Sequence, residues 1–321
     1  MSRPIVDGPV HQLHIVTGKG GVGKTTMAAA IACGLARDGR RVLLCEVEDR
    51  AGIGELFDAP GPCAEETRLA RTPHGGEVFG LSITAEEALR EYLSSFYRLG
   101  LAGRMLDRFG VFDFATSIAP GLGDVLLTGK VYEAVRRRDR RRSNPYSAVV
   151  LDAPPTGRIA RFLNVHEAVS DLARVGPIHN QAASITKLFR SEQTVLHLVT
   201  LLEDMPVTET IEATADLEPT GIEAISIICN KVTSDLTPDD LAAVHTMDGL
   251  DLPDLDPAVR VGLADQLTAA AERATAEAHC REQLAETGLD LTDIGLIPGG
   301  VDQAFLYETG AKLAADLDLE G

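Results

Sequence analysis

A glycine-rich segment follows directly after a short apolar stretch near the start of the chain, and it constrains the fold more than any other feature. Residues 13–17 are apolar enough for a buried strand, residues 18–25 read Gly-Lys-Gly-Gly-Val-Gly-Lys-Thr, and an Ala-rich segment with helical periodicity follows over 26–36. Glycines let consecutive backbone N–H groups surround phosphate oxygens without a Cβ clash, and the positive end of the following helix attracts the same anion. The order of strand, glycine loop and helix therefore predicts a phosphate-binding loop.

The side chains of this loop suit a nucleoside triphosphate with its magnesium ion. Lys24 is expected to neutralise the β- and γ-phosphates, and the Thr25 hydroxyl is expected to ligate Mg²⁺. The motif occurs once, which predicts one ATPase unit rather than a tandem pair. The predicted nucleotide-binding residues of the loop are Gly18, Gly20, Gly21, Val22, Gly23, Lys24, Thr25 and Thr26.

The rest of the chain alternates between apolar strands and helical stretches, which predicts an α/β fold with a doubly wound parallel sheet. Further strands are expected at 41–47, 78–83, 146–151, 195–200, 222–229 and 291–297, and a long helix at about 258–286. We expect a single P-loop ATPase domain over residues 1–321. Mostly helical insertions at about 85–142 and 166–192 are interpreted either as a cap at one edge of the sheet or as ordinary core helices.

The composition excludes several classes of protein. The chain carries 48 acidic residues against 30 Lys and Arg, so its formal net charge of −18 would repel nucleic-acid phosphates. Aromatic residues make up only 4% and Trp is absent, which leaves few rings for stacking on bases. We therefore expect no nucleic-acid partner.

The apolar runs and the cysteines indicate a cytoplasmic location. No run approaches the ~18 apolar residues that a membrane-spanning helix needs, and the first ten residues do not resemble a signal peptide. The five cysteines lie far apart and form no Cys-x-x-Cys pair. This spacing argues against a disulfide framework or a paired-cysteine zinc site, and it fits a reducing compartment.

A second segment with phosphate-site character follows the apolar strand at 146–151. Asp152 stands at the predicted carboxyl end of that strand, where an acid suits the coordination of a magnesium ion through water. Thr25 and Asp152 are thus the predicted metal-site residues. The stiff run Pro154-Pro155-Thr156-Gly157 is expected to place backbone N–H groups near a γ-phosphate.

These motifs resemble one ATPase family. Lys19, at the second position of the loop, resembles the deviant Walker A signature, and Asp152 with Pro155-Thr156-Gly157 resembles the switch of arsenite-pump and tail-anchored-protein-targeting ATPases. Within this group the chain looks like the actinobacterial "anion-transporting ATPase" branch. The resemblance implies a dimer in which Lys19 crosses the interface and stabilises the transition state at the partner's nucleotide.

Shorter segments extend the resemblance over most of the chain. Asn230, at the end of a predicted strand, matches the residue that reads the adenine amino group, and Pro298 lies in a segment similar to the closing adenine loop. Glu203 and Glu209 fall in a segment similar to one that flanks the family's nucleotide pocket. The resemblance therefore implies ATP, and Asn230-Lys231-Val232-Thr233 lacks the Asp of a guanine-reading motif.

The chain departs from the family pattern after the second strand. Glu48 occupies the position of the Asp that positions the attacking water, and its carboxylate reaches one methylene further. Glu46 and Asp49 are the alternatives for this role, and all three could equally be solvated acids. The catalytic residues that we predict are Lys19, Lys24, Glu48 and Asp152. The paired zinc cysteines and the grouped metalloid-binding cysteines of the family are missing.

The function predicted from the sequence is an ATP-hydrolysing dimeric switch that couples turnover to a partner, a hydrophobic client or a membrane process. Its partner is either a second copy or a paralogous ATPase. The alternatives are a soluble subunit of an anion or metalloid efflux pump, a membrane-protein partner, and a weakly hydrolysing binding partner of a paralogue. Six arginines within Arg136–Arg142 are either a solvated helix end or a peripheral contact with anionic membrane.

Overall fold

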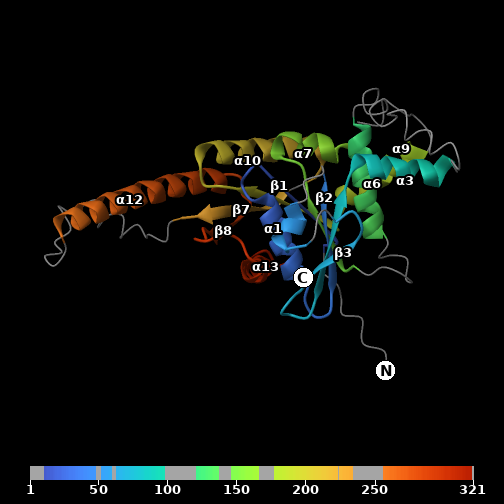
Figure 1. Cartoon of the computed structure of the whole chain (residues 1–321). Coiled ribbons are helices and arrows are strands. Elements are labelled where there is room, and N and C mark those ends of the chain that lie inside the picture. Colours follow the sequence, from blue (N-terminus) through green and yellow to red (C-terminus); the bar gives the residue numbers. More distant parts are fainter. Residues whose placement is uncertain are drawn as a thin grey trace.

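An eight-stranded sheet runs through the protein in the order β3-β4-β2-β5-β1-β6-β7-β8 (Figure 1). The computed structural model describes residues 11–47, 52–59, 63–97, 121–136, 146–165, 177–222, 224–233 and 256–319. Its strands are β1 (Leu13–Gly18), β2 (Arg41–Val47), β3 (Thr67–Arg71), β4 (Glu77–Ile83), β5 (Ala148–Asp152), β6 (Thr194–Thr200), β7 (Ala224–Val232) and β8 (Asp290–Gly295). Every neighbouring pair is parallel except β3 and β4, which are antiparallel.

Helices connect most of these strands. They are α1 (Lys24–Leu35), α2 (Gly52–Leu56), α3 (Ala85–Tyr97), α6 (Leu122–Arg136), α7 (Thr156–Leu163), α9 (Pro177–Phe189), α10 (Asp204–Leu217), α12 (Pro257–Ala285) and α13 (Gln303–Asp316), with a 3-10 turn, η2, at Glu218–Thr220. In the described part of the chain, none of them combines the length and the apolar character that a membrane crossing requires. The 29-residue helix α12 extends well beyond the ends of β7 and β8 (Figure 1).

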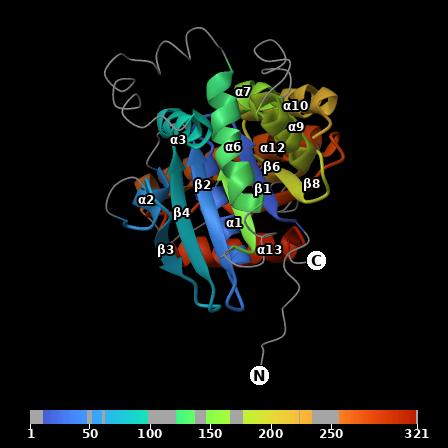
Figure 2. The ribbon, with the colours of Figure 1, turned by 90° about the vertical axis from the view of Figure 1, so that its right-hand side faces the viewer.

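The central strands are buried on both faces, as the continuous apolar runs predict for a parallel sheet. Leu13 and Ile15 of β1 point into a core cluster formed with α6, α7, α9 and α10, whereas Val16 points into a second cluster formed with α1 and α13. Figure 2 shows α6 in front of the strands and α13 behind them. The sheet is thus the middle layer of a three-layer α/β/α structure.

Helix α1 is buried on nearly all sides because α13 crosses it closely. A Cβ on Gly34 would lie 2.2 Å from the carbonyl oxygen of Gly310, and a Cβ on Gly310 would lie 2.3 Å from that of Ala30. Glycines at both positions therefore let the two backbones touch. This contact fixes the helix that follows the predicted phosphate loop.

Parts of both predicted helical insertions are described, and they pack on the sheet. Val131 and Val135 of α6 and Ile185 and Phe189 of α9 belong to the same buried cluster as the central strands. Helix α3 adds a small separate cluster in which Ala88 and Leu89 meet Leu126. The described parts of α3, α6 and α9 thus contribute side chains to the buried core. The predicted cap stays a prediction, because residues 98–120, 137–142 and 166–176 lie outside the described chain.

The predicted α/β fold is confirmed, with one strand that the sequence pattern missed. All seven predicted strands are present, and the long helix lies within one residue of its expected bounds. The missed strand is β3, whose five residues Thr-Arg-Leu-Ala-Arg include three polar ones. Among the described strands it lies at the edge of the sheet with β4 as its one neighbour, so it needs no continuous apolar sequence.

Candidate nucleotide-binding site

The loops that follow five neighbouring strands meet at one edge of the sheet. Because β5, β1, β6, β7 and β8 are parallel, their carboxyl ends lie on the same side. The chain builds one half of the sheet from β2 and β4, returns to β5 beside β1, and then continues outward from β6. Ligands of open α/β sheets bind where the strand order reverses in this way, which is the position of the loop after β1.

The phosphate loop has a backbone shape that glycine makes possible. Gly21 and Gly23 adopt φ values of 87° and 96°, in the left-handed region that side chains other than glycine disfavour. A Cβ on Gly18 would lie 2.1 Å from the carbonyl oxygen of Val199, and one on Gly23 would lie 2.3 Å from the Nδ2 atom of Asn230. Three of the four predicted loop glycines are therefore needed, either because their φ is positive or because a side chain would clash.

Two charged or polar side chains of the loop lie where the sequence places them, at the start of α1. Lys24 is the first residue of this helix, and its nearly buried ammonium group donates a hydrogen bond of 3.1 Å to the carbonyl oxygen of Lys19. The Thr25 hydroxyl donates a 2.6 Å hydrogen bond to Oδ2 of Asp152. Asp152 is the last residue of β5 and is 2% exposed. Two oxygen-bearing groups suited to magnesium therefore stand side by side.

The segment after Asp152 is tied to the end of β1. The Thr17 hydroxyl donates to the carbonyl oxygen of Pro154 at 2.6 Å. Thr156 begins α7 and is 5% exposed, yet its hydroxyl has no hydrogen-bond partner among the residues that the structure describes. Buried hydroxyls are normally paired, so this one is open to a water molecule or a ligand group.

Glu46 lies beside Asp152 in the sheet and is also buried. The two residues are register partners on β2 and β5, and Glu46 is 1% exposed. Its carboxylate accepts hydrogen bonds from the backbone N–H of Ile53 in α2 and from the Ser82 hydroxyl at the end of β4. The hydrogen bond from Ile53 to Glu46 therefore joins the residues that precede and follow the segment 48–51. Glu48 and Asp49 themselves lie outside the described residues.

The two residues predicted to contact adenine lie at the same sheet edge but in different surroundings. Asn230, near the end of β7, is buried and donates from Nδ2 to the carbonyl oxygen of Val22 at 2.8 Å, while its Oδ1 accepts from the N–H of Lys231. Asn230 therefore supports the phosphate loop directly. Pro298 is exposed in the loop after β8, three strands away from β1, where Ile297 is also exposed.

Lys19 is held within its own chain. Its ammonium group lies 2.7 Å from a carboxylate oxygen of Glu209, which belongs to α10. The two side chains are 27% and 35% exposed, so the ion pair is partly open to solvent. The sequence predicts no individual role for Glu209, because nothing in the pattern around residue 209 indicates which loop residue its carboxylate reaches.

The cysteines are buried, and nothing in their surroundings within the described chain marks a reactive thiol. All five are free and buried. Burial raises the pKa of Cys33 to about 12 and is the main cause of the equally raised pKa of Cys229, which keeps both thiols protonated. Over the described residues, no three His, Cys, Asp or Glu side chains are grouped to hold a metal ion.

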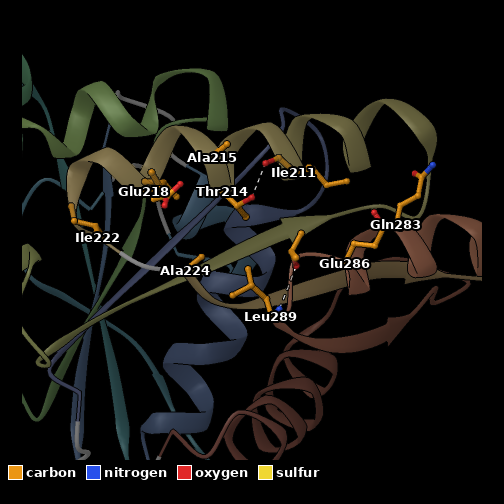
Figure 3. Close-up of a pocket in the computed structure, with 12 residues that line it drawn as sticks. Ile211, Thr214, Ala215, Glu218, Ile222, Ala224, Gln283, Glu286 and Leu289 are labelled. Atoms are coloured by element: carbon orange, nitrogen blue, oxygen red, sulfur yellow. Dashed lines mark hydrogen bonds between the residues drawn. The ribbon is translucent and has the colours of Figure 1, made fainter.

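A cavity of about 620 Å³ lies at the opposite, amino-terminal end of the outer strands. Figure 3 shows its lining between α10, the end of α12, and the starts of β7 and β8. Ile211, Ile222 and Leu289 supply apolar surface, and Glu218 and Glu286 supply carboxylates. These two acids would repel phosphates, so the cavity is not part of the nucleotide site.

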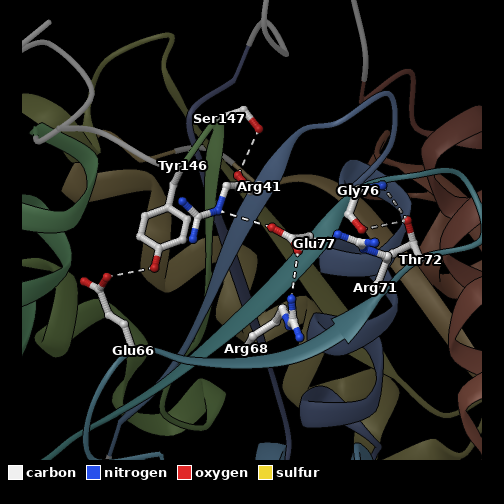
Figure 4. Close-up of polar contacts among 9 residues, drawn as sticks. All are labelled: Arg41, Glu66, Arg68, Arg71, Thr72, Gly76, Glu77, Tyr146 and Ser147. Carbon is white, nitrogen blue, oxygen red and sulfur yellow. Dashed lines mark hydrogen bonds and ion pairs between the residues drawn. The ribbon is translucent and has the colours of Figure 1, made fainter. Parts of the chain in front are cut away.

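Three arginines near the starts of β2 and β4 share one acid. Arg41, Arg68 and Arg71 converge on Glu77 with N–O distances of 3.6, 3.3 and 3.3 Å (Figure 4). The Arg41 guanidinium also lies 4.2 Å from the centre of the Phe79 ring. These contacts join β2, β3 and β4, so the three arginines have a structural role and do not indicate an anion-binding site.

Comparison with known proteins identifies the family. A family model described as anion-transporting ATPase matches residues 11–191, which is more than half of the 321-residue chain. The chain belongs to the anion-transporting ATPase family. The resemblance predicted from the phosphate loop and the Asp152 segment is thereby confirmed, and membership of this family makes the chain an ATPase.

Named relatives of this anion-transporting ATPase come from bacteria and a plant. ATPase BagA of Mycobacterium tuberculosis (strain ATCC 25618 / H37Rv) is 47% identical over 317 residues, which cover 94% of this chain and 92% of the relative. The arsenical pump-driving ATPase of Escherichia coli is 30% identical over 68% of this chain and 34% of its own length. ATPase GET3B of Arabidopsis thaliana is 22% identical over 58% of this chain and 48% of its own.

Proposed function

We propose that this anion-transporting ATPase is a dimeric switch that binds ATP with Mg²⁺ and hydrolyses it to control a partner. The phosphate loop would hold the β- and γ-phosphates through its backbone N–H groups and Lys24. Thr25 and Asp152 would hold Mg²⁺, which neutralises the phosphate charge when it is bound. Glu48 would orient the attacking water, and Lys19 of the partner subunit would stabilise the charge that develops in the transition state.

The contact between Thr25 and Asp152 carries this proposal. It places a hydroxyl and a buried carboxylate at the start of α1, beside a loop that needs glycine at three positions. The buried and unpaired Thr156 hydroxyl adds a polar group on the γ-phosphate side, judged over the described residues. Hard oxygen donors and a glycine loop are what a magnesium nucleotide requires.

Calorimetry and a phosphate-release assay test this function. The wild-type chain should bind Mg·ATP and release phosphate, and Lys24→Ala should lose both activities. Lys187→Ala is the control, because Lys187 is an exposed lysine on α9, away from the loop edge. Absence of Mg·ATP binding by the wild-type chain would overturn the proposal.

The identity of Glu48 bears on whether the second subunit of the dimer is a copy of this chain or a paralogue. A Glu in place of the usual Asp reaches further, and a displacement of one methylene costs rate. We propose that the chain works most efficiently beside a paralogous ATPase, to whose site it donates Lys19. Hydrolysis by the chain alone should then be slow, and it should rise on mixing with the paralogue unless Lys19 is replaced by Ala. A full rate for the isolated chain would favour the homodimer.

Two further uses of the switch are supported by separate observations. Similarity to the arsenical pump-driving ATPase of Escherichia coli favours a soluble subunit of an anion pump, although the buried cysteines count against a metalloid. The run Arg136–Arg142, of which only Arg136 at the end of α6 is described, favours contact with anionic lipid. Sedimentation with phosphatidylserine vesicles and with neutral vesicles distinguishes lipid contact from a solvated helix end.

A further inference from the structure

The ion pair between Lys19 and Glu209 joins the phosphate loop to α10. Lys19 Nζ lies 2.7 Å from Oε1 of Glu209, although the two residues are far apart in the chain. The backbone of Lys19 is engaged as well, since its carbonyl oxygen accepts the hydrogen bond from Lys24 Nζ. The side chain that the switch needs at the dimer interface is thus directed toward its own subunit.

The pair also connects to the other side of the nucleotide site. Helix α10 packs against α7, which begins at Thr156 in the segment proposed to contact the γ-phosphate. A phosphate that binds Lys24 competes with the Lys19 carbonyl oxygen for the same ammonium group. Lys19 is therefore in contact with both Lys24, which is expected to bind the phosphates, and Glu209 of α10.

We propose that Glu209 is a positioning residue that holds Lys19 in its own subunit until a nucleotide-loaded partner takes it over. This inference rests on the proposed function. An ion pair exposed to this degree is weak and is screened by salt, so it is readily exchanged. A triphosphate on the partner carries several negative charges against the single charge of Glu209, and the transfer of Lys19 is favoured when the subunits close.

The test compares two substitutions on one helix. Glu209→Gln removes the charge that holds Lys19, while Glu212→Gln removes an exposed charge three residues further along α10. Phosphate release is measured over a range of protein concentrations, because turnover that needs dimer closure rises with concentration. Glu209→Gln should lower the concentration at half-maximal activity by about two- to five-fold, which is the range a surface ion pair supports. Glu212→Gln should behave as wild type.

A Lys19→Ala background separates positioning from a structural effect. Because Lys19 is itself a predicted catalytic residue, this comparison measures self-association of the Mg·ATP-bound chain by sedimentation velocity rather than phosphate release. Glu209→Gln should strengthen self-association when Lys19 is present and change nothing when Lys19 is already absent, and 0.5 M NaCl should bring the wild type closer to Glu209→Gln. The proposal is overturned if Glu209→Gln matches the wild type, or if its effect persists beside Lys19→Ala. A wild-type chain that neither binds Mg·ATP in calorimetry nor releases phosphate overturns the proposed function instead, and this inference falls with it.

Discussion

Thr25 and Asp152 are 127 positions apart in the chain and are joined by a hydrogen bond of 2.6 Å. The sheet explains their meeting. Asp152 is the register partner of Val16 in β1, so the end of β5 lies beside the point where the phosphate loop leaves the sheet. The loop then returns the first turn of α1 to the same edge. A metal bound there would be held by Thr25 from the start of α1 and by Asp152 from the end of β5.

Asp152→Asn should weaken the affinity for Mg²⁺ by about 10- to 100-fold, since the neutral amide loses the charge that stabilises the ion while keeping the size of the side chain. The measurement is phosphate release as a function of MgCl₂ concentration. Asp290→Asn, at an exposed position at the start of β8, is the control. Thr25→Ser keeps the hydroxyl and should stay near wild type. An unchanged Mg²⁺ requirement in Asp152→Asn would exclude Asp152 from the metal site.

The sequence predicts the loop and the parallel sheet because both depend on local patterns. Gly18 to Thr25 specify a backbone shape that few other residues permit, and a strand such as Ala148–Asp152 reads as buried on both faces. Asp152 could be placed beside Thr25 because a doubly wound sheet brings the carboxyl ends of its strands to one edge.

Side-chain partners across the fold could not be predicted in the same way. Glu209 reaches Lys19 only because α10 starts near the loop and presents that residue at the right turn of the helix. Glu46 is an alternative to Glu48 for positioning the water, and no sequence pattern indicates that the Glu46 carboxylate binds the backbone N–H of Ile53. Such contacts depend on the exact packing of neighbouring elements.

Gly34→Ala should lower the free energy of unfolding by about 1–3 kcal/mol, because the new methyl group meets the backbone of Gly310 rather than a flexible side chain. Gly262→Ala is the matched control in α12, where a Cβ meets nothing within 4 Å. It should stabilise the protein by up to about 1 kcal/mol through helix propensity. Urea denaturation measures both variants. Equal stability of Gly34→Ala and the wild type would show that α13 moves away from α1 at little cost.

The cysteines should not respond to trivalent arsenic in the folded protein. All five are buried, and pKa values near 12 for Cys33 and Cys229 leave almost no thiolate near neutral pH. Arsenite should therefore leave ATP hydrolysis unchanged, and a thiol reagent such as DTNB should react with five thiols only after denaturant is added. Rapid labelling of the native protein, or activation by arsenite, would contradict this and would favour a metalloid pump.

A buried pair of histidines should make the protein less stable in mild acid. His14 of β1 and His197 of β6 stack with a ring-centre distance of 5.6 Å and form a 3.3 Å contact between Nδ1 and Nε2. His197 also shares a 2.8 Å hydrogen bond with the Ser226 hydroxyl. Burial, and then the neighbouring His11, lower the pKa of His197 to about 3, while burial and the charge of His197 hold the pKa of His14 well below its usual value.

The unfolded chain binds protons on these histidines below about pH 6.5, whereas the folded chain does not until near pH 3 for His197. Their contribution to stability is therefore present above pH 6.5 and is lost as the pH falls. His197 alone should therefore lower the free energy of unfolding by about 2 kcal/mol between pH 7 and pH 5. Urea titrations at several pH values measure this slope. His197→Gln should make it shallower, and His279→Gln, at an exposed position on α12, should leave it unchanged. The same slope in His197→Gln as in the wild type would show that other groups control the acid response.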